Sequence, residues 1–213
     1  MKFKGLLASL FVLISIMANA QDWTTDTYKY GELYEGYIIN DKGVKMLGYI
    51  KYRNRNINQE EVYFYHENNP STKKKYLVND LQEFKVGDKT YRCIMYSGNE
   101  SIQKKKANLL ISDGCISSFL WYDRASGYNT MKKLPGESDE AFGNRKFPST
   151  VVYFKTGDDM AVSESFFDDD FVKRMSTYVK DNKELAKKIK AETSGYKIAN
   201  VAAILTEYNE GCQ

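Results

Sequence analysis

The sequence predicts an α+β protein: an antiparallel β-sandwich or partly closed β-barrel of about nine strands, followed by two or three C-terminal helices. Strand-like runs separated by turn residues fill the chain from residue 35 to residue 164. The apolar period then changes from two residues to about 3.6, which is typical of amphipathic helices. The chain has 213 residues, 42% hydrophobic and 28% charged, a composition that excludes a disordered chain and a polytopic membrane protein.

Residues 1–20 have the pattern of a cleaved signal peptide. Lys2 and Lys4 precede an apolar run, and Ala-Asn-Ala then forms the small-x-small site that places cleavage between Ala20 and Gln21. The apolar run is shorter than the about 20 residues that a membrane span needs. No cysteine follows Ala20, so no lipid anchor is expected at this site. We therefore predict an exported protein, periplasmic or secreted, with no transmembrane span in the mature chain.

Residues 21–165 form the predicted β-rich region. A hairpin is expected from residue 35 to residue 53, because Gly43 supplies the positive φ that a short loop needs. Side chains of its second strand alternate between two faces, and the more polar face indicates a sheet with one side in water. Asp113-Gly114 is a second strong hairpin turn. The other strands are expected at 61–67, 73–77, 83–86, 89–97, 106–112, 115–123, 150–155 and 160–164, with a single turn at 78–81.

Two further segments complete the prediction. Residues 124–148 read as a loop rich in turn residues, and a loop of this length is either functional or mobile. Residues 166–213 are predicted to form helices that pack on the sheet as part of the same domain. Asp181 with Glu184 resembles a capping box for the second of these helices.

The three cysteines are Cys93, Cys115 and Cys212, and export would expose them to an oxidising environment. Cys93 and Cys115 lie in strand-like runs, whereas Cys212 lies in the terminal tail. A Cys93–Cys115 disulfide is therefore favoured if any pair forms. Three unpaired, mostly buried thiols are the alternative. The spacing is not that of a zinc site.

Few residues offer catalytic chemistry. His66 is the one histidine of the chain and lies in a predicted strand, where a structural role is favoured over catalysis. The sequence has no GxSxG, HExxH, GxGxxG or P-loop motif. Glu164 and residues 168–170 are best explained as the start of a helix, although such carboxylates leave glycosidase-type hydrolysis and Ca²⁺ binding open. We predict no catalytic residue, no cofactor and no metal site.

Tyrosine is unusually abundant, with 17 residues in the chain. Tyr49, Tyr52, Tyr63 and Tyr65 are the candidate binding surface, because tyrosine on a strand offers a rigid amphipathic contact area. The alternative is that these rings pack in the core and across the sheet. The lysine runs at 73–75 and 104–106 are interpreted as protection of strand edges, with an anionic partner as the alternative.

The signal peptide ending in Ala20-Gln21 and three short segments resemble a family of uncharacterised exported proteins from Bacteroidetes-type bacteria. The segments are residues 48–53 (GYIKYR), residues 79–84 (NDLQEF) and Tyr208-Asn209. In that family a G-x-I-x-Y strand is followed by a D-[IL]-x-x-F segment and then by a C-terminal helix. The resemblance implies a β-rich periplasmic or secreted protein and carries no activity or catalytic residue with it.

The net charge is the last constraint on function. The formal charge of +3 includes Lys2 and Lys4, which leave with the signal peptide, so broad electrostatic binding of nucleic acid is excluded. We predict an exported, non-catalytic protein that binds a protein, glycan or lipid partner of the envelope or the exterior through its aromatic sheet surface. The alternatives are a carrier of a small apolar ligand or lipid inside a barrel, and a hydrolase that uses carboxylates alone.

Overall fold

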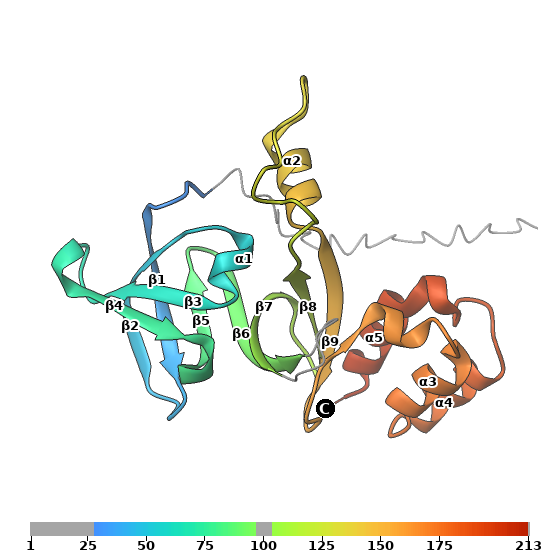
Figure 1. The fold of residues 1–213 in the computed structure, drawn as a ribbon. Helices are drawn as coiled ribbons and strands as arrows, with labels where there is room; N and C mark the ends of the chain where they lie inside the picture. The colour runs from blue at the N-terminus through green and yellow to red at the C-terminus, as the bar shows by residue number, and fades with distance from the viewer. Residues whose placement is uncertain (1–27, 97–103, 213) are drawn as a thin grey trace, which may run out of the picture.

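The computed structural model describes residues 28–96 and 104–212 (Figure 1). The predicted signal peptide, with its cleavage site between Ala20 and Gln21, lies outside the described residues. The α+β class is confirmed: strands dominate up to Ser163, and helices follow.

All ten described strands belong to one antiparallel sheet in the order β10-β9-β8-β7-β6-β5-β1-β2-β3-β4. The sheet is open, with β4 and β10 as its edges, so the structure does not confirm the predicted barrel. The strands are β1 Leu33–Asn40, β2 Lys45–Lys51, β3 Glu61–Tyr65, β4 Lys73–Leu77, β5 Leu81–Val86, β6 Lys89–Tyr96, β7 Lys104–Ser112, β8 Ile116–Tyr122, β9 Ser149–Lys155 and β10 Val162–Ser163.

The sheet coils into a roll over strands β1–β5. Only the short 3₁₀ turn Val78–Asp80 joins β4 to β5, although β1, β2 and β3 lie between those two strands in the sheet. The sheet must therefore bend sharply on itself. Gly36 and Gly48 face each other across β1 and β2, and a Cβ on Gly36 would lie 1.8 Å from the Lys85 carbonyl oxygen. Glycine at this position permits the close approach of β5 to β1.

Strand alternation divides the apolar side chains between the two faces of the sheet. The inside of the roll is filled by a cluster that includes Ile38, Phe64, Phe84 and Tyr91. Side chains of the opposite parity, such as Ile94 and Trp121, form a separate cluster on the other face of β6–β9. Both clusters are closely packed, which gives each face of the long sheet its own core.

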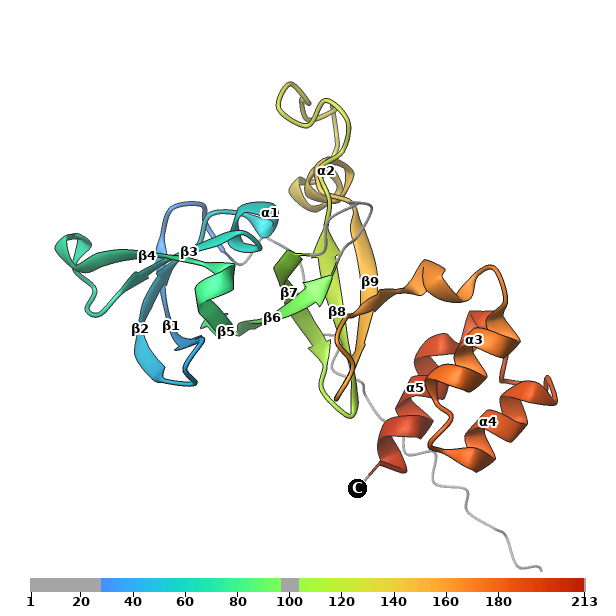
Figure 2. The same cartoon turned by 60° about the horizontal axis from the view of Figure 1, so that its bottom comes forward.

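The C-terminal helices pack beside β8 and β9 and form a third cluster, around Met175, Leu185, Ile189 and Ile204 (Figure 2). They are α3 Phe171–Tyr178, α4 Lys183–Lys190 and α5 Val201–Glu210. The predicted capping box at Asp181 is wrong by one residue, because Asn182 accepts the hydrogen bond from the Leu185 N–H. Asp181 makes other contacts, which are described below.

The disulfide joins Cys115 to Cys212, and Cys93 is a buried free thiol. The predicted Cys93–Cys115 pair is therefore wrong. Cys93 lies on β6 opposite Ala107 of β7, while Cys115 precedes β8, so β7 separates the two cysteines. The tail that carries Cys212 is held against β8, because the Asn209 side chain hydrogen-bonds both the N–H and the C=O of Ile116 at 2.9 Å.

Two helices occur where none was predicted. The single turn α1 Arg55–Asn58 lies between β2 and β3, and α2 Asp139–Lys146 lies within the predicted loop 124–148. Figures 1 and 2 both show α2 and its flanking residues projecting from the end of β8 and β9. We call residues 124–148 the arm. Helix α2 buries none of its side chains, so it has no apolar stripe that a periodicity search would detect.

Candidate functional site

Three of the four predicted surface tyrosines have the strand parity of the outer face of the roll. Tyr37 of β1 lies opposite Leu47 of β2, and Tyr49 of β2 lies opposite Tyr65 of β3. Tyr63 belongs to the same face, two residues before Tyr65. We call these five residues the aromatic face.

Burial changes the membership of the predicted surface. Tyr49 and Tyr63 are half-buried, and Leu47 is 72% exposed. Tyr65 has the right parity but is only 4% exposed. Tyr52 is excluded, because it has the parity of Ile50 and its ring lies in the core, 5.4 Å from the Tyr28 ring centroid. The two-residue alternation of the second strand puts Tyr52 and Tyr49 on opposite faces, so the sequence alone could have excluded Tyr52 from the surface.

Cations surround the rings of the aromatic face. The Lys45 Nζ lies 3.8 Å from the Tyr37 ring centroid, and the Lys73 Nζ lies 4.0 Å from that of Tyr63. These distances are within the range of cation–π attraction. Burial and a 2.7 Å hydrogen bond to Glu83 raise the pKa of the Tyr37 phenol to about 12, so this ring stays neutral at physiological pH.

An open hollow of about 520 Å³ crosses the aromatic face. Of its lining side chains, only Tyr49 belongs to the surface that the sequence predicts. The others come from β1, β2, β5 and the residue after β3, and only pairing across strands brings them together. The lining residues are Glu35, Gly36, Tyr37, Leu47, Gly48, Tyr49, His66, Lys85 and Gly87. His66 is exposed at this rim, with an edge-on ring contact to Phe64.

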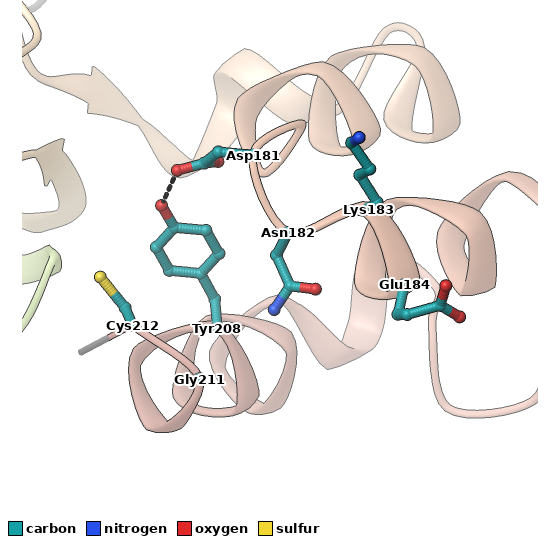
Figure 3. Close-up of a pocket in the computed structure, with 7 residues that line it drawn as sticks. All are labelled: Asp181, Asn182, Lys183, Glu184, Tyr208, Gly211 and Cys212. Atoms are coloured by element: carbon teal, nitrogen blue, oxygen red, sulfur yellow. Dashed lines mark hydrogen bonds between the residues drawn. The ribbon is translucent and has the colours of Figure 1, made fainter.

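A second, more polar hollow of about 400 Å³ lies where the C-terminal tail meets α4 (Figure 3). Asp181 accepts hydrogen bonds there from the Tyr208 hydroxyl and from the Lys155 Nζ, the latter at 2.7 Å. Burial raises the pKa of Asp181, but these two hydrogen bonds, a backbone hydrogen bond and the charge of Lys155 together outweigh it and lower the pKa overall. Glu184 points away from Asp181 in Figure 3. The site therefore holds an ionised carboxylate that anchors α5 and β9, rather than a pair of facing acids.

The other predicted features are distributed over the molecule. The acids at 168–170 precede α3, where the Asp170 side chain caps the helix by accepting from the Lys173 N–H. Among the residues that the structure describes, no three His, Cys, Asp or Glu side chains gather as a metal site would require. Within the same residues, no helix has the length and apolar character of a membrane span.

Comparison of the chain with protein-family models, with curated proteins and with solved structures finds no match. The resemblance to the exported family therefore stays a prediction, and the site has to be interpreted from its own chemistry.

Proposed function

We propose that the chain is an exported, non-catalytic protein that binds an acidic glycan of the envelope or the exterior through the aromatic face. The observation that carries this proposal is Leu47, which is 72% exposed on strand β2 and flanked by Tyr37 and Tyr49. A large apolar side chain held on an open sheet face, between aromatic rings, is typical of a contact surface.

The charge of this face favours an anionic partner. By strand parity it carries five lysines against three glutamates, which are Lys45, Lys51, Lys73, Lys75 and Lys85 against Glu35, Glu61 and Glu83. Glu61 is already paired with Arg53 and Lys75, and Glu83 with Arg92. The remaining ammonium groups beside flat tyrosine rings match sugar rings that carry carboxylate or sulfate substituents.

The two alternatives lack comparable support. A carrier of an apolar ligand needs space inside the roll, but Phe64, Phe84 and Tyr91 are at most 1% exposed and occupy that interior. A hydrolase that uses two carboxylates needs a facing pair. In the second hollow, Asp181 is engaged by Lys155 and Tyr208, and Glu184 points away from it (Figure 3). The binding surface therefore remains the better supported proposal.

The test measures binding of residues 21–213 to acidic and to neutral polysaccharides by affinity electrophoresis. The double variant Leu47→Asp/Tyr49→Ser should reduce the affinity for the acidic polymer at least tenfold. Leu134→Asp is the matched control. Leu134 is 57% exposed on the arm, which lies between β8 and β9, whereas the aromatic face lies on β1, β2 and β3. Equal losses in both variants, or binding of neutral polymers alone, would contradict the proposal. If a protein is captured and its capture depends on Tyr49, the partner of the aromatic face is a protein and not a glycan.

A further inference from the structure

Arg55 is a buried cation without a counter-ion in the part of the chain that the structure describes. It lies in the single helical turn α1 and is 4% exposed. Its guanidinium makes no ion pair with a described carboxylate; one Nη donates to the Asn144 side chain, and the group lies 5.3 Å from the Tyr122 ring centroid. Within the described residues, its Nε has no hydrogen-bond partner. Buried charges are ordinarily paired, so this one requires an explanation.

A second unsatisfied donor lies close to Arg55 along the chain. Asn58, three residues further along the same turn, has a buried Nδ2 with no hydrogen-bond partner among the described residues. Residues three apart on a helix lie on the same side, so both unsatisfied groups are donors in one neighbourhood. The phenols of Tyr52, Tyr91 and Tyr122 are close enough for the charge of Arg55 to lower their pKa values against the larger, opposite effect of burial. An anion would complete this set of groups.

The side chains of Asn56 and Gln59, next to Arg55 and Asn58, are hydrogen-bonded. Gln59, at the end of the turn, exchanges two hydrogen bonds with the Tyr122 backbone at 2.7 and 2.9 Å. Asn56 donates to the same Tyr122 carbonyl oxygen at 3.0 Å and accepts from Arg124. Asn56 and Gln59 therefore hold α1 against β8, and this attachment does not need the Arg55 guanidinium.

The arm covers Arg55 through a contact that is easily exchanged. Asn144 belongs to α2, which buries no side chain. The arm is held elsewhere, by Arg124, which donates to Asn56 and Glu60, and by Phe147, which packs against the core cluster of the roll. A neutral amide oxygen is a weaker acceptor for a guanidinium than a carboxylate or phosphate oxygen. An incoming oxyanion can therefore replace Asn144 without opening the apolar core.

We propose that Arg55 and Asn58 form a binding site for a small molecule carrying a phosphate or carboxylate group, with the arm as its cover. The planar fork of the guanidinium fits two oxygens of either group, and the Asn58 amide supplies a further donor. This site is separate from the aromatic face and does not depend on the proposed glycan binding.

The test compares thermal unfolding of residues 21–213 in sodium phosphate, sodium acetate and sodium chloride at equal ionic strength. Asn144→Asp places a carboxylate next to Arg55 within the chain. This variant should melt several degrees higher than the wild type in chloride and should lose the saturable rise that phosphate or acetate gives the wild type. Asn129→Asp, an exposed position of the same arm, adds the same charge away from Arg55 and should retain that rise.

The outcomes separate the possible sources of stabilisation. A rise with phosphate alone assigns a phosphate ligand, and a rise with both anions or with acetate alone assigns a carboxylate-compatible site. An equal, non-saturating rise in all three proteins is the general effect of an excluded salt and would overturn the proposal. The proposal is also overturned if Asn144→Asp leaves both the melting temperature and the phosphate response unchanged.

Discussion

Gly36 shows how a single residue determines the curvature of the sheet. An added Cβ would lie 1.8 Å from the Lys85 carbonyl oxygen, which is backbone and cannot rotate away. Gly36→Ala should therefore lower the free energy of unfolding by about 2 kcal/mol or more, as for other overpacked sites. Gly136→Ala is the comparison: Gly136 has a φ of +75° and no atom near its Cβ position, so only backbone strain of about 1 kcal/mol applies. Urea unfolding measures both, and equal losses would contradict this account.

Asp113, in the turn between β7 and β8, gives the stability of the protein a dependence on acid pH. Arg92 binds its two carboxylate oxygens at 3.0 and 3.1 Å, and this contact is the main reason that the pKa of Asp113 falls to about 2. Because the folded pKa is lowered, the stabilisation is present above the ordinary value near 4 and is lost as the pH falls through 2. The side chain is 61% exposed, so solvent screening reduces the effect to about 1 kcal/mol or less.

Asp113→Asn tests this pH dependence. The variant should be less stable than the wild type at pH 7 and equally stable near pH 1.5, so the two unfolding curves converge over that interval. Asp139→Asn, whose carboxylate pairs with Lys133 on the arm, is the control. A constant difference between Asp113→Asn and the wild type from pH 7 to pH 1.5 would show that the lost contact is not electrostatic.

At the scale of elements, local pattern predicts most of what lies in one stretch of chain. The hairpin at residues 35–53, the strand at 73–77 and the three C-terminal helices are all confirmed, because alternation, turn glycines and helical stripes are local properties. Helices α1 and α2 were not predicted, because they lack such a local pattern. One is a single turn and the other buries nothing, so neither has an apolar period.

At the scale of the whole molecule, the pairing of distant segments could not be predicted. The side-chain alternation of β2 correctly puts Leu47 and Tyr49 on one face, but no local signal brings Tyr37 or Lys85 beside them. The same limit applies to Arg55, whose burial depends on Tyr122 and on Asn144 of the arm. The cysteine pairing failed similarly, because Asn209 and α5 bring the tail back to β8 across a sequence separation of 97 residues.

The disulfide gives the last prediction, because it ties the C-terminal tail to the residue before β8. A cross-link that closes a loop of about 100 residues stabilises by up to about 4.7 kcal/mol through the entropy of the unfolded chain. Cys212→Ser should approach that loss in urea unfolding, whereas Cys93→Ala removes only a buried thiol and should lower stability by about 1 kcal/mol.

Thiol counting checks the pairing directly. Burial raises the pKa of the Cys93 thiol to about 12, so it should resist alkylation in the folded protein. In denaturant without reductant, one thiol per chain should react, and peptide mapping should place the label on Cys93. A label on Cys212 would instead support the pair between Cys93 and Cys115. Because α5 is also held by the Asn209–Ile116 hydrogen bonds, reduction alone should weaken the C-terminal cluster without unfolding the roll. Among the described residues, the core of the roll contains no residue of α3, α4 or α5.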